Sequence, residues 1–147
     1  MNFRPKSFAS QSVAIVAGVR TPFAKAGSDL APLTAVDLGV LAAREVIAQS
    51  GILAEEIDHV IIGNVAQPAN AANISRVIAL YAGVPKKVPA VTVQRNCASG
   101  LESISLGAVQ IATGQADVCL VGGTESMSNI PILFQDHAKD VFFRQLS

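Results

Sequence analysis

One stretch of this 147-residue sequence restricts the possible folds more than any other: residues 98–113 predict a helix with a single charge, Glu102. Its large apolar residues are spread around the whole cylinder of that helix; they are Leu101, Ile104, Leu106, Val109 and Ile111. A helix that is hydrophobic all round is a buried helix. A chain of this length cannot easily cover every side of it, so we expect residues 98–113 to lie inside a larger body.

The composition of the chain supports the same expectation. Half of the residues are hydrophobic and 15% are charged, whereas about 25% are charged in a typical soluble domain. The chain must therefore bury more of its surface than a free monomer of the same size does. Further chain, a partner subunit, or both would provide the additional cover. The 11 basic and 11 acidic residues balance. That balance argues against a nucleic-acid partner, because nucleic-acid-binding proteins carry a strongly basic patch.

The sequence also argues against a membrane span and a disulfide scaffold. No run of about 18 apolar residues is present, and two cysteines do not make a disulfide-rich domain. Residues 1–12 contain Arg4 and Lys6 without an acid, but they lack the apolar core of a secretory signal. We interpret them as a loose N-terminal arm. A reducing, cytoplasmic compartment is expected, with the mitochondrial matrix as the alternative.

Short apolar runs alternate with helix-like stretches, which is typical of βαβ units around a parallel sheet. The runs predicted as strands are 13–19, 57–65, 90–95 and 117–122. The first of them is apolar throughout, as in a strand buried on both faces. Helices are predicted over 34–50, 73–83 and 98–113. The predicted fold class is therefore α/β, with the order βαβαβαβ complete by residue 123.

Local signals define the ends of two of these helices. Thr34 is suited to cap the first N-terminus, and Asp37 three residues later completes a pattern that resembles a capping box. Gly51 is suited to end that helix. Its predicted inward face consists of Val36, Val40, Ala43 and Ile47. Asn73 can cap the next helix, which is expected to end at Gly83.

Small residues mark places where backbones are expected to approach one another. Gly100, Ser103 and Gly107 fall on one side of the apolar helix. A glycine inside a helix costs about 1 kcal/mol relative to alanine, so close packing is the expected reason for Gly107. Gly122 and Gly123 are interpreted as freeing the backbone for a tight turn beside a site.

Cys97 is the residue best placed to carry chemistry, because it lies where the strand 90–95 ends and the apolar helix begins. A helix N-terminus favours anions, and the thiolate is the nucleophilic form of cysteine. This effect is only about 0.3–2 kcal/mol, so a fully activated thiol also needs a neighbouring base. No acid occurs from residue 59 to residue 101, whereas four basic residues do: Arg76, Lys86, Lys87 and Arg95. A buried structural cysteine is the alternative, and spacing alone leaves both open.

The other candidate side chains are assigned to structure rather than to chemistry. Cys119 lies in an apolar strand, 22 residues from Cys97 and without the C-x-x-C spacing of a redox or zinc site. His59 lies at the start of a predicted strand and His137 in the tail, and neither is predicted to be catalytic. With no third ligand in view, no metal site is expected. Neither glycine-rich nucleotide motif is present.

Four short motifs resemble the thiolase family in their order and spacing. They are R-T-P-F at 20–23, G-N-V at 63–65, N-C-A-S-G at 96–100 and G-G-T-E-S-M-S at 122–128. The resemblance extends from Val13 to the C-terminus, with Thr124 standing where methionine is usual. It implies a thiolase-like α/β fold in which this chain is one βαβαβαβ half of a duplicated, layered structure. Helices buried between two sheets in that structure would supply the cover that residues 98–113 require.

Thiolases are acetyl-CoA acetyltransferases or 3-ketoacyl-CoA thiolases, so the resemblance implies acyl transfer between coenzyme A thioesters. Cys97 matches the family's acyl-carrying nucleophile. Acyl-CoA and CoA are the implied substrates, and no cofactor or metal is implied. The family's catalytic His, Asn and second Cys belong to its second half, and His59, His137 and Cys119 do not match them.

The resemblance also divides the chain into an arm (1–12), an α/β domain (13–130) and the start of a CoA-binding loop domain (131–147). It implies that these residues are about the first third of a family member and are inactive alone. It further implies a dimer or tetramer that assembles through the strand 90–95. Two alternatives are kept. One is a ketosynthase, which uses the same cysteine geometry with other flanking motifs, and the other is a non-catalytic subunit that only assembles.

Overall fold

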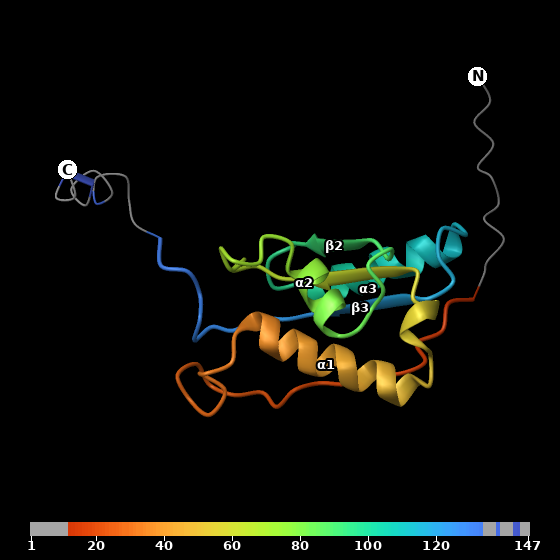
Figure 1. Ribbon diagram of the computed structural model, residues 1–147, viewed down its shortest axis with the longest axis horizontal. Coiled ribbons are helices and arrows are strands. Elements are labelled where there is room, and N and C mark those ends of the chain that lie inside the picture. The colour runs from red at the N-terminus through yellow and green to blue at the C-terminus, as the bar shows by residue number, and fades with distance from the viewer. Residues whose placement is uncertain (1–11, 134–137, 139–142, 145–147) are drawn as a thin grey trace, which may run out of the picture.

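The computed structural model describes residues 12–133, 138 and 143–144. Its centre is a parallel sheet of three strands in the order β2-β1-β3 (Figure 1). The strands are β1 (His59–Gly63), β2 (Ala90–Val93) and β3 (Cys119–Gly123). The central strand β1 pairs with β2 on one side and with β3 on the other. The predicted α/β class with a parallel sheet is confirmed.

Helices cover both faces of the sheet. They are α1 (Ala35–Ser50), α2 (Ile74–Tyr81) and α3 (Ser99–Ala112). Figure 1 shows α2 packed on one face with α1 outside it, and α3 on the opposite face. A short 3-10 turn, η1 (Ala54–Glu56), lies between α1 and β1. All three predicted helices are confirmed to within two residues at each end. Within the described residues, no helix combines the length and hydrophobicity needed to cross a bilayer.

The predicted caps are confirmed in detail. The Thr34 hydroxyl accepts a hydrogen bond from the Asp37 N–H at 3.2 Å, and the Asp37 carboxylate accepts one from the Thr34 N–H at 2.9 Å. The hydroxyl of Thr34, and after it the N–H, lower the pKa of Asp37 by bonding its carboxylate. Gly51 ends α1 in the left-handed conformation with φ 70°. Asn73 caps α2 through its side-chain oxygen, which accepts from the Arg76 N–H at 3.1 Å.

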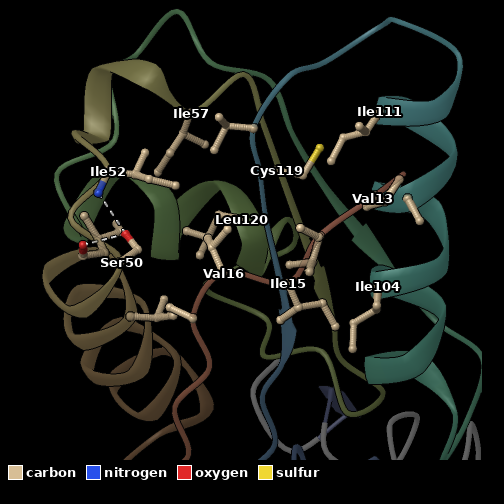
Figure 2. A pocket seen from close by; sticks show the side chains of 18 residues that line it. Val13, Ile15, Val16, Ser50, Ile52, Ile57, Ile104, Ile111, Cys119 and Leu120 are labelled. Carbon is tan, nitrogen blue, oxygen red and sulfur yellow. Dashed lines mark hydrogen bonds between the residues drawn. The ribbon is translucent and has the colours of Figure 1, made fainter. Parts of the chain in front are cut away.

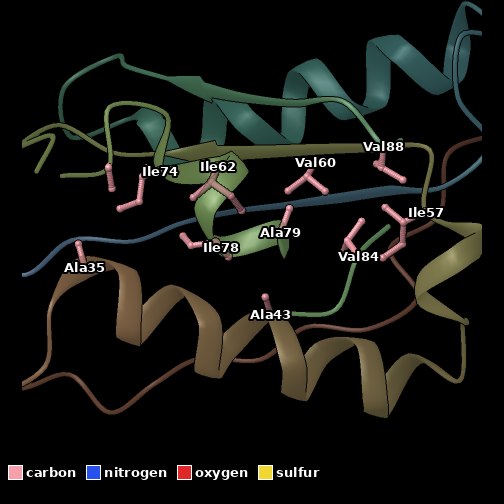
Figure 3. Close-up of a cluster of buried hydrophobic side chains, with 11 residues drawn as sticks. Ala35, Ala43, Ile57, Val60, Ile62, Ile74, Ile78, Ala79, Val84 and Val88 are labelled. Atoms are coloured by element: carbon pink, nitrogen blue, oxygen red, sulfur yellow. The ribbon is translucent and has the colours of Figure 1, made fainter. Parts of the chain in front are cut away.

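The main core lies between the sheet and the two helices α1 and α2 (Figure 3). Val60 of β1 and Ile74 and Ile78 of α2 are completely buried there. The helix α1 comes close because Gly39 has no side chain: a Cβ at that position would lie 2.4 Å from the Ile78 Cδ1 atom. The predicted inward face of α1 is confirmed, since Ala43 is buried and its other members pack against this core.

The predicted strand 13–19 is wrong for the described part of the chain. This segment helps to line an apolar cavity of about 310 Å³ together with α1, β3 and α3 (Figure 2). It joins no sheet there, and Val13, Ile15 and Val16 remain 41%, 80% and 69% exposed. A run of apolar residues indicates only that a segment favours burial, and not that it forms a strand. A strand also needs ladder hydrogen bonds and cover on both faces, and the described residues supply neither to this segment.

The other three predicted strands are present but shorter, and their ladders end for local reasons. Before β3, the N–H groups of Asp117 and Val118 donate to the Asp58 carboxylate at 2.8 and 3.0 Å instead of to a strand. Gly122, the last residue of the predicted strand, and Gly123, expected to begin the turn, complete β3 and pair with the end of β1. They extend the sheet because a parallel ladder accepts any residue whose backbone stays extended.

The helix α3 meets the sheet through its small residues, as predicted. Its buried residues are Ser99, Ser103 and Gly107. A Cβ on Gly107 would lie 2.6 Å from the Val121 Cγ1 atom, so the glycine is required for this close approach. The described residues do not bury α3 on all sides, which agrees with the expectation that a chain of this length cannot cover the helix alone. Leu101 and Val109 on the outer side are 70% and 54% exposed, because the described residues cover one side of the helix only.

Candidate active site

Cys97 lies in the turn between β2 and α3, at the carboxyl edge of the parallel sheet. The Ala98 N–H donates to the Arg95 carbonyl oxygen at 3.0 Å and closes the turn. Asn96 inside the turn has φ 48°, a left-handed conformation that asparagine tolerates better than most residues. Cys97 itself is exposed and is a free thiol. The structure thus places it at the start of α3, as expected, and not in the core of the described chain.

The hydroxyl of Ser99 occupies the inside of this turn. The hydroxyl accepts from the Arg95 N–H at 2.7 Å, and its O–H donates to the Asn96 carbonyl oxygen at 2.7 Å. The Ser99 N–H donates to the same carbonyl oxygen at 3.1 Å, and the residue is 4% exposed. Sequence reasoning missed Ser99 because it used N-C-A-S-G only to find Cys97. The available signal was a serine at a helix start, where its hydroxyl readily bonds nearby backbone groups.

Glycines allow the first turn of α3 to rest on bare strand backbone. A Cβ on Gly63 would lie 2.4 Å from both the carbonyl carbon and the carbonyl oxygen of Ser99, and 2.8 Å from the Gly100 nitrogen. A Cβ on Gly123 would lie 3.1 Å from the Gly100 Cα. Gly63 and Gly123 are partners in the β1–β3 ladder. The start of α3, next to the Cys97 turn, therefore packs against two neighbouring glycines, Gly63 and Gly123, which have no side chains to keep it away.

Glu125 connects the loop after β1 to the chain after β3. One carboxylate oxygen accepts from the Val65 and Ala66 N–H groups at 2.9 and 3.1 Å, and the other accepts from the Asn64 side-chain amide at 3.2 Å. That amide also donates to the Thr124 carbonyl oxygen at 2.9 Å. Among the described residues, the buried Oδ1 atom of Asn64 has no hydrogen-bond partner. The G-N-V and G-G-T-E-S-M-S motifs are thus bonded to each other next to the Cys97 turn.

The same segment is tied to the beginning of α1. The Thr124 hydroxyl donates to the Ala35 carbonyl oxygen at 2.6 Å, and the Ser126 hydroxyl donates to the Leu33 carbonyl oxygen at 2.9 Å. A methionine side chain, which the resemblance described above implies at position 124, has no hydrogen to donate in this way. These side chains hold the carboxyl edge of the sheet together, a structural role that sequence reasoning did not assign to them.

The basic residues expected to surround the thiol point elsewhere. Arg95 forms an ion pair with Glu102 in the first turn of α3, and its hydrogen bond to this carboxylate raises the pKa of Arg95. Arg76 donates to two carbonyl oxygens of the chain that enters β2, at 2.7 Å each. Lys86 and Lys87 lie in that same chain, at the amino edge of the sheet. The expected basic surroundings of Cys97 are therefore wrong: three of the four cations lie at the other edge and the fourth is paired.

His59 and Cys119 lie at the amino edge of the sheet, opposite Cys97. They are partners at the starts of β1 and β3, and at a rise of about 3.3 Å per residue the carboxyl end of β1 is about 13 Å away. Burial, and secondarily the charge of Asp58, raise the pKa of the Cys119 thiol. His137 lies outside the described residues. The described residues contain no group of three or more His, Cys, Asp or Glu that could hold a metal ion.

The two thiols are expected to differ in reactivity. Iodoacetamide should label Cys97 about tenfold or more faster than Cys119 in native buffer, because only exposed thiolates react readily and the pKa of Cys119 is raised. Peptide mass mapping after a short exposure measures both rates in one sample. A urea-unfolded sample is the control, in which the two cysteines should react alike. Equal labelling in native buffer would contradict the prediction.

The family model for the thiolase N-terminal domain matches residues 13–144. A probable acetyl-CoA acyltransferase of Staphylococcus aureus strain NCTC 8325 is 42% identical over 121 residues, which are 82% of this chain and 31% of that relative. An acetyl-CoA acetyltransferase of Syntrophomonas wolfei is 39% identical over 124 residues, which are 84% of this chain and 31% of that relative.

Solved structures agree. The chain superimposes on the crystal structure of the Bacillus anthracis acetyl-CoA acetyltransferase with a TM-score of 0.81 and 38% identity, covering 84% of this chain and 31% of that one. For the Acat5 thiolase from Ascaris suum in complex with coenzyme A, the TM-score is 0.80 at 36% identity, covering 82% and 32%. The chain spans 31% of the length of the first curated relatives. Because the matched region contains every described strand and α-helix, the chain belongs to the thiolase family and contains its N-terminal domain.

Proposed function

We propose that Cys97 is the nucleophile of an acyltransferase that moves acyl groups between coenzyme A thioesters. The observation that carries this proposal is the exposed Cys97 turn at the carboxyl edge of the sheet, in a chain of the thiolase family. Ligands of open α/β sheets bind outside the carboxyl ends of the strands, so a thioester would approach from this side. The names of the relatives, and the coenzyme A bound to the Ascaris protein, support the substrate class.

In the first half-reaction, the Cys97 thiolate attacks the carbonyl carbon of acetyl-CoA. A carbon–sulfur bond forms and the carbonyl π electrons move onto the oxygen. Backbone N–H groups at the start of α3 are suited to stabilise that oxyanion. When the adduct collapses, the bond to the CoA sulfur breaks, CoA leaves and takes up a proton, and the acetyl group stays on Cys97. With a 3-ketoacyl-CoA, the thiolate attacks the 3-keto carbon, the bond between C2 and C3 breaks, and the resulting carbanion of acetyl-CoA takes up a proton and leaves.

In the second half-reaction, the acyl group passes from Cys97 to free CoA or to the carbanion of acetyl-CoA. The first route completes thiolysis and the second completes condensation, and CoA takes part as a substrate in both. Each route needs a base and an acid close to the thiol. Among the described residues, His59 and Cys119 lie at the wrong edge to serve. We therefore expect the 147 residues alone to give no steady thiolysis of acetoacetyl-CoA.

The proposal is tested by trapping the acyl intermediate. The intact protein is incubated with acetyl-CoA and quenched in acid, and the peptide that contains Cys97 is weighed. One acetyl group on this peptide is the expected result. The matched control is Cys119→Ala, which should be acetylated on Cys97 to the same extent. An acetyl group on another residue, or none on the protein, would contradict the assignment.

The intact protein is further proposed to be a dimer or tetramer whose subunits meet along β2. This strand lies at one edge of the sheet, and Val91 is 41% exposed. The polar side chains of Thr92 and Gln94 bond within the chain and not across this strand edge. The Thr92 hydroxyl donates to the Asn73 side-chain oxygen at 2.9 Å, and the Gln94 amide donates to the Val65 carbonyl oxygen at 3.1 Å. The proposed contact between subunits is thus supported by the position of β2 at the edge of the sheet and not by these two side chains.

Native mass spectrometry of the intact protein at micromolar concentration should therefore show at least a dimer. A charge at the proposed contact, Val91→Lys, is expected to shift the distribution toward monomer. Leu53→Lys, at a position that is 65% exposed and distant from β2 in the sequence, is the control and should not change it. A monomer in the wild type would contradict the proposal.

The compartment and the domain division stay predictions. The two cysteines of the described part are free thiols, which supports a reducing compartment: the cytoplasm, with the mitochondrial matrix as the alternative. The boundary between the α/β domain and a CoA-binding loop domain remains proposed at residues 130 and 131.

A further inference from the structure

Ser99 joins the two sides of the Cys97 turn through one buried hydroxyl. The hydroxyl oxygen lies 2.7 Å from the Arg95 nitrogen before the cysteine and 2.7 Å from the Asn96 carbonyl oxygen. It accepts from the first group and donates to the second, so its single proton and one lone pair are both used. Ser99 is 4% exposed, so the protein covers almost all of this side chain.

These bonds fix the peptide group that Cys97 belongs to. The Asn96 carbonyl and the Cys97 N–H are parts of one planar peptide unit and point in opposite directions. The Ser99 hydroxyl and the Ser99 N–H both donate to that carbonyl, at 2.7 and 3.1 Å. Holding the carbonyl from inside the turn therefore orients the Cys97 N–H outward. It also restricts the direction in which the Cys97 side chain leaves the backbone.

Among the described residues, the only other hydrogen bond to the Asn96 carbonyl oxygen is the longer one from the Ser99 N–H, and no other side chain bonds it. The bond from the Ala98 N–H to Arg95 closes the turn without touching the Asn96 carbonyl. Ala98, the cap residue of α3, has no side-chain hydrogen bond to offer. The left-handed backbone of Asn96, at φ 48°, is less stable than an extended or helical one and needs support from its surroundings. Ser99 gives that support and is itself held against Gly63.

We propose that Ser99 is a positioning residue for the reaction of Cys97: its buried hydroxyl holds the turn in the geometry from which the thiol attacks. This inference rests on the proposed role of Cys97 as the acyl-carrying nucleophile. Ser99 itself forms no bond to the substrate. A misplacement of about 1 Å in a reacting group can lower a reaction rate about a hundredfold. The hydrogen bonds of the Ser99 hydroxyl can therefore affect the rate of acetylation although Ser99 does not bind the substrate.

Ser103 is the matched control, because it is the same residue type one turn further along α3. It is completely buried, and its hydroxyl oxygen lies 2.6 Å from the Gly100 carbonyl oxygen and 2.7 Å from the Gly122 carbonyl oxygen. It joins the helix to β3 and does not touch the turn. A role that is only structural would give the same result for Ser99→Ala and Ser103→Ala.

The experiment uses the intact protein and follows acetylation of Cys97 by acid quench over a range of acetyl-CoA concentrations. Ser99→Ala is expected to lower the saturating rate constant about tenfold or more while the half-saturating concentration stays within about twofold of wild type. Ser103→Ala is expected to lower the thermal midpoint at least as far as Ser99→Ala does, yet to keep the rate constant within about twofold. Ser99→Thr, which retains a hydroxyl, should recover most of the lost rate.

Equal rate constants for Ser99→Ala and wild type would overturn the inference and leave the role of Cys97 standing. So would an equal loss of rate in the two alanine variants. A wild-type protein that carries no acetyl group on Cys97 would remove the proposed function, and the inference with it. If Ser99→Ala does not fold, the acetylation rate constant of Asn96→Ala tests whether the geometry of the turn controls the reaction. Alanine tolerates φ 48° poorly, so the rate constant should fall at an unchanged half-saturating concentration, and an unchanged rate constant would overturn the inference.

Discussion

Cys97→Ser is expected to abolish acetyl transfer by the intact protein while leaving its fold in place. A hydroxyl is barely ionised at neutral pH. A helix N-terminus contributes at most about 2 kcal/mol to an anion, which is about a thirtyfold change in an equilibrium constant. That is far too little to make serine an effective nucleophile without an adjacent base. We expect the rate of acetylation at residue 97 to fall by a factor of about 10⁴ or more.

The stability of this variant should change little, because serine is close to cysteine in size and residue 97 is exposed. Thermal unfolding of the variant checks this, and mass analysis of the acid-quenched peptide checks the acetylation. Wild-type protein should carry the acetyl group and the variant none. Turnover that survives the substitution, with the acetyl group on another residue, would refute Cys97 as the nucleophile.

Gly63→Ala is expected to produce the largest loss of stability of any single methyl group added to this domain. The new Cβ would lie 2.4 Å from the Ser99 carbonyl carbon and oxygen. Both are backbone atoms, so no side chain can rotate to make room, and either β1 or the start of α3 must move. Overpacking of this kind costs about 3 kcal/mol. Because the displaced segment contains the Cys97 turn, we also expect the acetylation rate to fall about a hundredfold.

The control for Gly63→Ala is the same change at Gly100, directly across the contact. A Cβ on Gly100 would meet nothing nearer than the Gly123 Cα at 3.9 Å, which is ordinary van der Waals contact. Gly100 also lies in a helix, where alanine is favoured over glycine by about 1 kcal/mol. Urea unfolding should therefore show a large decrease in midpoint for the first variant and none for the second. Two equal midpoints would mean that the strand and helix can separate without cost.

The sequence predicted what is decided within a few neighbouring residues. The caps of α1 and α2 were predicted because Thr34, Asp37 and Asn73 bond backbone groups three residues away. The position of Cys97 was predicted for the same reason, since a strand end, a turn and a helix start follow one another directly. The small side of α3 was also predicted, because the spacing of Gly100, Ser103 and Gly107 places them on one helix face.

The predictions that failed concern contacts between segments that are distant in the sequence. The run 13–19 is apolar enough for a strand, but a partner edge and outer cover cannot be read from its own residues. Counting charges between residues 59 and 101 did not reveal that Arg76 bonds the chain entering β2 at the far edge. The hydrogen-bond partners of Glu125 are about 60 positions away in the sequence, so the residues next to Glu125 gave no indication of them.

The strand order β2-β1-β3 also determines the order in which this domain can assemble while it is being synthesised. The central strand β1 is made first, and β3 follows it only after 55 intervening residues, from 64 to 118. At about 5–20 residues per second, the ribosome takes about 3–11 s to make that stretch. For these seconds one edge of the most buried strand has no partner, because parallel pairing must wait for a segment that is distant in the sequence. The nascent protein is therefore most exposed to wrong pairing with other chains before residue 123 has been added.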